Sequence, residues 1–304
     1  MIRLAIRVRR EQAELVLAEL LELAPGGVEE CSPTADVVEY AVYGAPGELP
    51  ELPDLRAAAG DALVEVSTSE TADDWHERWR RFHRPVVVTA PAAPSNLPAP
   101  RNPAGSVRAL RVRPPWEAAD DRLADPAHEI VIDPGRAFGT GAHATTRMCL
   151  ELLLALAAEQ QFRGPLLDVG SGSGVLAIAA ARLGFAPVLA LDHERESVDA
   201  ARANSAVNGV QLDVRRADLH AGPLPWLAAD DPPPGPLVLL ANLLRPLLLD
   251  LARTIALAPA QMIASGLLVE QVDEVVAAFG ERLGLREHRR RVSGEWAAVW
   301  LIAP

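Results

Sequence analysis

Two glycine-rich segments carry the residue types best suited to chemistry in this chain. Residues 166–174 read LLDVGSGSG, an apolar strand followed by a turn with glycines at Gly170, Gly172 and Gly174 and then by the helical pattern VLAIAAARLG. Such glycines let the backbone approach a ligand closely, and the helix offers unpaired N–H groups to a polar or anionic group. The turn therefore predicts a nucleotide-like cofactor. The other segment, residues 133–146, reads DPGRAFGTGAHATT and lies a short helix upstream.

Three acidic residues follow or end the predicted strands near this turn. Asp192 ends the second strand, where a carboxylate can accept hydrogen bonds from both hydroxyls of a ribose; the alternative is that it caps the helix starting at Glu194. Asp168 is interpreted as a structural acid that forms hydrogen bonds near the cofactor. Asp218 follows the third strand, where the acid or its backbone neighbour could meet an adenine amine, or where it is simply exposed to solvent.

The residues from 116 onward alternate between strand and helix patterns. Helices are predicted at 143–158, 174–183, 194–208, 245–256 and 269–283, and strands at 165–169, 188–192, 210–216, 237–241, 261–265, 285–292 and 296–302. This alternation predicts an α/β fold with a doubly wound, mostly parallel sheet, to which the terminal hairpin adds one antiparallel strand.

The chain is expected to contain a second, smaller domain. Residues 1–66 show strand patterns at 2–8, 28–31 and 37–43 around a helix at 11–23, which predicts a small α+β unit for docking or substrate recognition. Residues 67–115 are expected to link it to the catalytic domain, residues 116–304. The linker includes a helix at 71–83, whose Trp75, Trp79 and Phe82 form an aromatic packing stripe, and a proline-rich loop at 91–105.

Composition narrows the possible partners. The formal charge of −12 over 304 residues argues against broad binding to nucleic-acid phosphates and suits a basic substrate. Cys31 and Cys149 lie far apart among apolar residues, so neither a disulfide nor a metal site is expected. No signal-peptide pattern and no apolar run of transmembrane length is present, from which we expect no membrane association and a cytoplasmic location. A monomer is expected, because no long apolar stripe is left unexplained.

Longer stretches of sequence resemble a known family. DVGSGSGVLAIAAARLG, followed by LALDHERESVDAARANSAVNGV, resembles class I S-adenosylmethionine-dependent methyltransferases. The upstream DPGRAFGTGAHATTRMCLELL is more specific and resembles the ribosomal protein L-eleven methyltransferase (PrmA) family, whose pattern is DPG-x-AFGTG-x-H-x-TT. ANLL at 241–244, SGLL at 265–268 and Glu295-Trp296 also fit this family. The resemblance covers nearly the whole chain, weakly before residue 70 and strongly from 130 onward.

The resemblance implies a seven-stranded Rossmann-like sheet, S-adenosyl-L-methionine as cofactor and large-subunit ribosomal protein eleven as protein substrate. It carries the family's cofactor contacts over to Thr146, Gly170, Asp192 and Asn242, and the positions of Gly172 and Asp218 add these two as cofactor-binding candidates. Three departures bear on substrate specificity rather than on cofactor binding. Ser171 replaces the cysteine of GCGSG, Arg245 replaces the alanine of N-I-L-A, and Ala144 replaces the proline of THPTT.

Methyl transfer to an amine requires alignment and exclusion of water. A lysine amine has a pKa of about 10.4 and an α-amine of about 7.7–8, and burial beside a cation lowers either value. Asn242, at the carboxyl end of a central strand, is the candidate catalytic residue that orients the amine, the alternative being a structural turn asparagine. Phe138 is expected to cover the cofactor or the acceptor channel. His143 either caps or packs the helix after Gly141 or takes part in catalysis.

The leading hypothesis is a protein N-methyltransferase that modifies lysine side chains, the N-terminal α-amine or both. The first alternative is a relative with a different protein substrate. A second is a non-catalytic cofactor-binding protein that acts as an assembly or RNA factor, which Asn242, the FGTG loop and the acidic charge disfavour. A third is a nicotinamide-dependent oxidoreductase, which the G-x-G-x-G spacing and the terminal hairpin disfavour, and which a cofactor-binding assay would separate.

Overall fold

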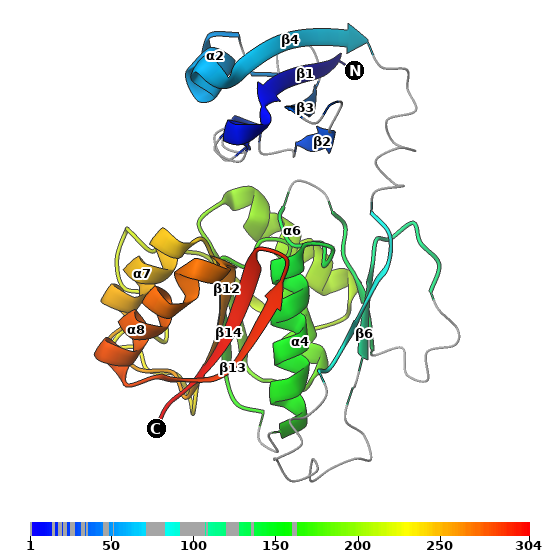
Figure 1. Cartoon of the computed structure of the whole chain (residues 1–304). Coiled ribbons are helices and arrows are strands. Elements are labelled where there is room, and N and C mark those ends of the chain that lie inside the picture. The colour runs from blue at the N-terminus through cyan, green and yellow to red at the C-terminus, as the bar shows by residue number, and fades with distance from the viewer. Residues whose placement is uncertain are drawn as a thin grey trace. The chain divides into compact units, whose positions relative to one another are not determined.

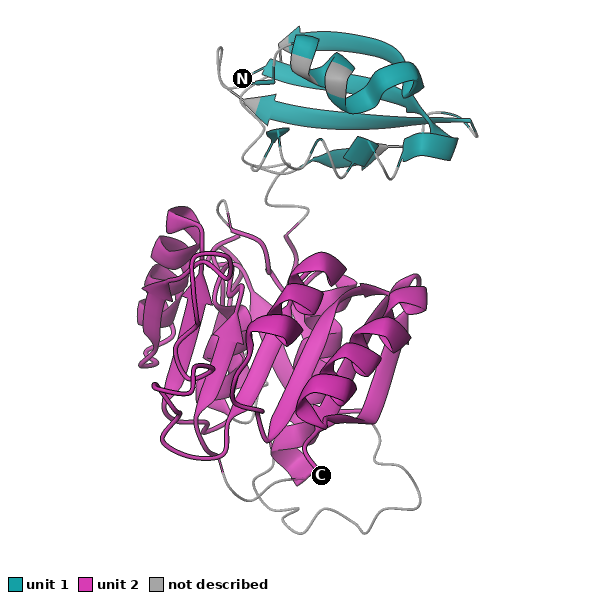
Figure 2. Ribbon diagram, turned by 90° about the vertical axis from the view of Figure 1, so that its left-hand side faces the viewer, with its two compact units in different colours: residues 1–82 teal, residues 83–304 magenta. Residues whose placement is uncertain are grey.

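The computed structural model of the chain contains two compact units, residues 1–82 and residues 83–304 (Figure 2). The structure describes residues 2–13, 16–17, 20, 23–24, 28–31, 34, 36–44, 49–50, 52–70, 83–91, 107, 109–119, 128–134, 137–159 and 163–304. The predicted helix at 71–83 lies outside these residues except for His83, and so does most of the predicted loop at 91–105.

The first unit is built on a four-stranded antiparallel sheet in the order β2-β3-β1-β4. Its elements are β1 (Ile2–Arg9), β2 (Glu29–Cys31), β3 (Val37–Gly44), α2 (Leu52–Ala59) and β4 (Leu63–Glu70), with 3-10 turns at Arg10–Gln12 and Gly60–Ala62. The described residues from 13 to 23 are helical, and Ala24 lies just after them outside the helix. Leu4, Ile6 and Val8 alternate along β1 and are buried in one core with Leu20 and Leu55, because alternate strand residues share a face.

The second unit begins at His83 and includes part of the segment expected to be a linker. There β5 (Val86–Thr89), β6 (Ala109–Arg113) and β7 (Glu129–Val131) form a three-stranded sheet. Val88 pairs with Leu110, and Val112 pairs with Ile130, and all four side chains are buried in the same core as the first helix of this unit. Apolar burial therefore ties these strands to the larger unit.

The larger sheet has seven strands in the order β10-β9-β8-β11-β12-β14-β13. Figure 1 labels the last three of them, β12, β14 and β13. The strands are β8 (Leu166–Val169), β9 (Val188–Asp192), β10 (Asp213–Arg216), β11 (Val238–Asn242), β12 (Gln261–Leu268), β13 (Arg286–Ser293) and β14 (Trp296–Ile302). β8 to β12 are parallel, and β14 runs antiparallel to both its neighbours. The predicted seven-stranded, mostly parallel Rossmann-like sheet with an antiparallel hairpin strand is confirmed.

Helices cover both faces of this sheet. α4 (Ala144–Glu159), α5 (Val175–Arg182) and α6 (Arg195–Val207) pack on one face, and α7 (Arg245–Thr254) and α8 (Val272–Leu283), which follows a 3-10 turn at Val269–Gln271, pack on the other. Leu166 lies in the first core and its neighbour Leu167 in the second. The strand order reverses between β8 and β11, and in sheets of this type ligands bind at the carboxyl ends of the strands at such a point.

Within the described part of the chain, no helix combines the length and the apolar character that crossing a membrane requires.

Candidate functional site

The glycine turn after β8 is hydrogen-bonded to the loop that precedes α4. The backbone N–H of Ser173 donates to the carbonyl oxygen of Phe138 at 2.8 Å, and the Ser173 hydroxyl donates to the carbonyl oxygen of Gly139 at 2.6 Å. Gly172 has a φ of +51°, and a Cβ there would lie 2.4 Å from the Phe138 carbonyl oxygen. Glycine is required at 172 because the two glycine-rich segments meet at this residue.

Gly170 connects the turn to the strand ends on the other side. Its N–H donates to the carbonyl oxygen of Leu191 at 2.8 Å, and a Cβ at 170 would lie 2.4 Å from Cδ2 of Leu243. Leu243 in turn donates its N–H to the carbonyl oxygen of Ser265 at 3.0 Å. The ends of β8, β9, β11 and β12 are thus joined around the turn.

Asp192 uses both carboxylate oxygens within this framework. Oδ2 accepts the Gly172 N–H at 2.9 Å, and Oδ1 accepts the Glu194 N–H at 3.0 Å, while the residue is only 7% exposed. The bond from Glu194 is the one expected of a residue that caps the following helix. The bond from Gly172 directs the carboxylate toward the glycine turn. Asp218 differs, because it is exposed and its Oδ1 accepts the N–H of His220 in its own loop.

Buried acceptors without partners lie under the turn. Asp168 is fully buried, and its carboxylate oxygens lie beyond normal hydrogen-bond distance of the described residues, although the backbone of Ala177 interacts with the carboxylate. The buried hydroxyl of Ser171 has no hydrogen-bond partner among the described residues. Burial, with a further contribution from the negative charge of Asp192, raises the pKa of Asp168 to about 7. A buried polar group without a partner is costly. The site therefore suits a ligand that brings a positive charge and hydrogen-bond donors.

The first turn of α4 adds polar groups beside β11. Thr146 is buried, and its Oγ1 lies 3.5 Å from Nδ2 of Asn242, which ends β11. The Oδ1 of Asn242 makes no hydrogen bond to any residue that the structure describes. The structure thus brings Thr146, Gly170, Gly172, Asp192 and Asn242 to one edge of the sheet.

Phe138 begins a row of aromatic rings at the same edge. Its side chain is 61% exposed, its ring centroid lies 5.4 Å from that of His143, and the His143 centroid lies 5.2 Å from that of Trp296. The Nδ1 of His143 lies 2.7 Å from the Thr145 hydroxyl and accepts the Thr145 N–H at 3.4 Å. His143 therefore packs against the start of α4.

Comparison with known proteins identifies the family. The family model described as "Ribosomal protein L11 methyltransferase (PrmA)" matches residues 54–302. The chain belongs to this family. It is 38% identical over 232 residues to the ribosomal protein L11 methyltransferase of Heliobacterium modesticaldum, covering 75% of this chain but 63% of that protein. The chain thus spans less than two thirds of the length of this relative.

Two further comparisons agree. The Geobacter sulfurreducens ribosomal protein L11 methyltransferase is 36% identical over 255 residues, covering 82% of this chain and 73% of that protein. The crystal structure of a ribosomal protein L11 methylase from Lactobacillus delbrueckii subsp. bulgaricus superposes with a TM-score of 0.51 at 30% identity, covering 64% of this chain and 94% of that chain.

The PrmA-type motifs therefore converge in space on the residues described above. The FGTG loop contacts the glycine turn through Phe138 and Ser173, and ANLL contacts it through Leu243 and Gly170. SGLL contacts ANLL through Ser265, and the Glu295-Trp296 pair reaches the FGTG loop through His143. Trp296 was not among the site residues predicted from the sequence, although its motif was a signal of the family.

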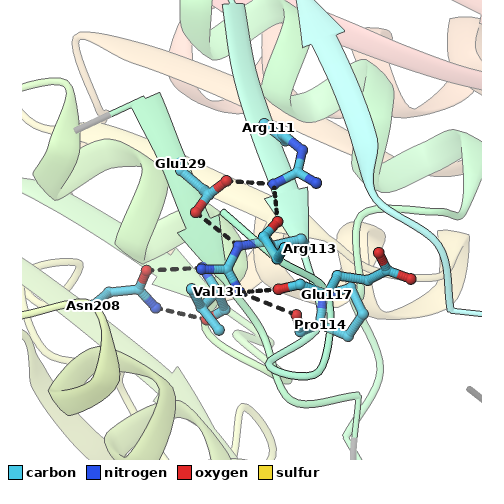
Figure 3. A network of polar contacts seen from close by, with 8 residues as sticks. Arg111, Arg113, Pro114, Glu117, Glu129, Val131 and Asn208 are labelled. Carbon is cyan, nitrogen blue, oxygen red and sulfur yellow. Dashed lines mark hydrogen bonds and ion pairs between the residues drawn. The ribbon is translucent and has the colours of Figure 1, made fainter. Parts of the chain in front are cut away.

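Sequence reasoning also missed two residues that bind the glycine turn and the residues just before the FGTG loop. Asn204 in α6 donates from Nδ2 to the carbonyl oxygen of Ser173 at 2.9 Å and accepts the Asp133 N–H at 3.1 Å. Asn208 accepts the Val131 N–H at 2.9 Å and donates to the Val131 carbonyl oxygen at 2.7 Å (Figure 3). The sequence pattern places both residues in the predicted helix at 194–208 and predicts no further role for them.

An arginine–glutamate cluster fixes the strand that carries Val131. Glu129 of β7 accepts hydrogen bonds from Arg111 and, at 2.7 Å, from Nε of Arg113, both on β6 (Figure 3). Arg113 also donates to the carbonyl oxygens of Pro114 at 3.3 Å and Glu117 at 2.8 Å. The three-stranded sheet therefore positions the start of the DPGRAFGTG segment from one side while α6 holds it from the other.

Proposed function

We propose that this chain is an S-adenosyl-L-methionine-dependent protein N-methyltransferase that methylates ribosomal protein L11, on lysine side chains, on the N-terminal α-amine or on both. The observation that carries the proposal is the pairing of two features at one sheet edge. The residues that would hold the cofactor meet at the glycine turn, and Asn242, whose Oδ1 makes no hydrogen bond to the described residues, ends the neighbouring strand β11. Membership of the PrmA family supports the choice of substrate.

The residues present fit S-adenosyl-L-methionine. Gly170 and Gly172 leave no room for side chains between the turn and Leu243 or Phe138, so the turn stays tight, and Asp192 beside it suits ribose hydroxyls. The buried carboxyl of Asp168 and the hydroxyl of Ser171 suit the charged amine end of such a ligand. Thr146 and Asn242 would close the site from α4 and β11, and Asp218 would lie at its exposed adenine end. When bound, the cofactor supplies a methyl group on a cationic sulfonium.

Asn242 acts on the acceptor. Its Oδ1 accepts a hydrogen bond from the neutral amine, which leaves the nitrogen lone pair directed away from the side chain and toward the cofactor. Desolvation beside a positive charge lowers the pKa of the amine, so the proton leaves to water before transfer and no dedicated base is needed. Phe138, held by the bond from Ser173, limits the access of water.

The remaining features suit a basic protein substrate. A formal charge of −12 raises the encounter rate with a positively charged partner. The first unit, residues 1–82, is the proposed docking module, because the sheet face opposite its core carries ion pairs of Arg3 and Arg7 with Glu39 and of Arg7 with Glu65. We also propose that the chain is a monomer and that it acts in the cytoplasm, where ribosomal proteins are made.

Intact-mass spectrometry tests the proposal. Purified ribosomal protein L11 is incubated with the chain and S-adenosyl-L-methionine, alongside Asn242→Ala. We expect mass gains in steps of one methyl group that are lost in the variant, while calorimetry shows that the variant still binds the cofactor; peptide mapping then identifies the modified amines. Cofactor binding without any mass gain would reject L11 as substrate and favour a different protein. Gains that persist in Asn242→Ala would reject the role of Asn242.

A further inference from the structure

The aromatic row at the carboxyl edge has no role in the proposed function beyond its first member. Phe138 comes from the FGTG loop, His143 immediately precedes α4, and Trp296 is the first residue of β14. Because β14 is antiparallel to β12, its first residue lies at the same edge as the carboxyl ends of the parallel strands, where Trp296 pairs with Leu268, the last residue of β12. Three segments far apart in the sequence therefore place aromatic rings together.

Both halves of the proposed site are bonded to this row. Phe138 accepts the hydrogen bond of Ser173 from the glycine turn. His143 contacts Thr145, and the next residue, Thr146, lies against Asn242. The row is thus linked through Thr145 and Thr146 to Asn242, which would receive the amine, and the exposed ring of Phe138 forms one end of the row.

The electrostatic character of the row favours an organic cation. An aromatic face attracts a cation within about 6 Å of its centroid, by roughly 0.5–1 kcal/mol when exposed and about 2 kcal/mol or more when desolvated. His143 does not oppose this attraction with a charge of its own, because burial, and then the positive charge of Arg147, lower its pKa. Arg147 itself is exposed, so its charge is screened by solvent.

We propose, resting on the function proposed above, that Phe138, His143 and Trp296 form an aromatic wall that holds the N-methylated ammonium of the target amine between rounds of transfer, and that Trp296 determines how many methyl groups one amine receives. In each round the lone pair of the amine forms the N–C bond while the methyl–sulfur bond breaks and its electron pair goes to sulfur. The resulting ammonium gives its proton to water before the next round. A methylated ammonium sheds its water more readily than an unmethylated one, so the rings hold it longer.

Two substitutions of Trp296 test the wall. Trp296→Leu keeps an apolar side chain without a π face, and Trp296→Phe keeps a π face. At equal total methyl transfer to L11, we expect intact masses of the leucine variant to shift at least about threefold toward singly methylated amines, with the phenylalanine variant close to wild type and cofactor affinity unchanged in both. Val207→Ala, which removes an exposed apolar side chain at the end of α6, serves as the control. A wild-type distribution in Trp296→Leu, or equal shifts in both variants, would overturn the proposal.

A second measurement uses the unaltered protein and is independent of both folding of the variants and activity. Saturation-transfer NMR is recorded with S-adenosylhomocysteine bound, while aromatic protons are irradiated in the presence of tetramethylammonium or of tert-butanol, its neutral analogue of similar shape. We expect stronger transfer to tetramethylammonium, and equal transfer to the two probes would overturn the wall. If wild type leaves L11 unmodified, the proposed function fails, whereas the NMR comparison still decides whether the wall binds cations.

Discussion

The backbone N–H of Ser173 donates to the carbonyl oxygen of Phe138 at 2.8 Å, and this bond joins two motifs that the sequence presents separately. The Ser173 hydroxyl adds a second bond to Gly139, and Asn204 binds the Ser173 carbonyl oxygen from α6. The FGTG loop and the glycine turn therefore form one bonded unit. A site built in this way is preorganised before its ligand arrives, which reduces the ordering cost of binding.

Gly172→Ala tests this unit. The new Cβ would lie 2.4 Å from the Phe138 carbonyl oxygen, so the loop must move. Gly209 is a matched control, because its φ of +62° imposes a similar backbone strain while no atom lies within 4 Å of its Cβ position. We expect Gly172→Ala to weaken cofactor binding by tenfold or more, about 1.4 kcal/mol, in calorimetry, and Gly209→Ala to leave affinity unchanged. If both substitutions weakened cofactor binding equally, backbone strain alone would explain the loss, and the contact with Phe138 would have no part in it.

Asp192→Asn and Asp218→Asn distinguish the two acids. Asp192 is buried and bonded to the glycine turn, so losing its charge should cost about 1.5–3 kcal/mol of cofactor binding, the usual value of a hydrogen bond to a charged group. Asp218 is exposed and bonded to its own loop, and we expect a change of less than about threefold there. Unchanged cofactor affinity in Asp192→Asn would assign this residue to helix capping alone.

The buried carboxyl of Asp168 should make stability depend on pH. An aspartate has a pKa of about 3.9 in the unfolded chain, and burial raises the pKa of Asp168 to about 7 in the folded protein. Between these values the folded protein binds more protons than the unfolded chain, so the free energy of unfolding falls as pH rises. Relative to Asp168→Asn, we expect wild type without cofactor to lose up to about 1.4 kcal/mol per pH unit across this window. The free energy of unfolding is measured by urea unfolding at a series of pH values. The same pH dependence in both proteins would contradict the expectation.

The ion pair of Arg245 and Glu274 tests how surface charge next to the proposed site affects substrate binding. Nε and Nη2 of Arg245 donate to the two carboxylate oxygens of Glu274 at 2.5 and 2.6 Å, and both side chains are exposed. We expect Arg245→Ala to leave cofactor affinity unchanged and to lower the KM for L11, because the unpaired carboxylate attracts a basic substrate. Glu274→Gln should raise the KM by leaving the cation unpaired. Steady-state kinetics at low and high salt check both, and shifts of the same sign in the two variants would point to geometry instead of charge.

The alternation of strand and helix patterns was sufficient to predict the larger sheet. The bounds predicted for β9 and β14 match the structure, because both strands are apolar runs with a clear boundary: β9 ends at the charged Asp192, and β14 starts directly after the turn at 294–295. Three strands of the fold were not predicted. β7 has three residues, β5 has four, and β4 reads LVEVSTSE, which lacks the apolar alternation of a half-buried strand.

The site was predicted less completely than the fold. The glycine turn and Asn242 follow from local patterns, since each lies where a strand ends. The contact of Trp296 with His143 depends on the antiparallel register of β14, and the bonds of Asn204 depend on the face that α6 turns to the sheet. Such contacts join residues distant in the sequence, and no periodicity within one segment reveals them.

The place of β14 between β12 and β13 constrains the order in which the protein folds. β13 is synthesised before β14, yet it pairs with the rest of the sheet through β14. Until residues 296–302 leave the ribosome, the apolar edge of β12 has no neighbour on that side. β13 can therefore join the sheet only together with β14 or after it, and the ring of Trp296 takes its place at the same late stage. A nascent chain paused before this point would expose a strand edge prone to association with other chains.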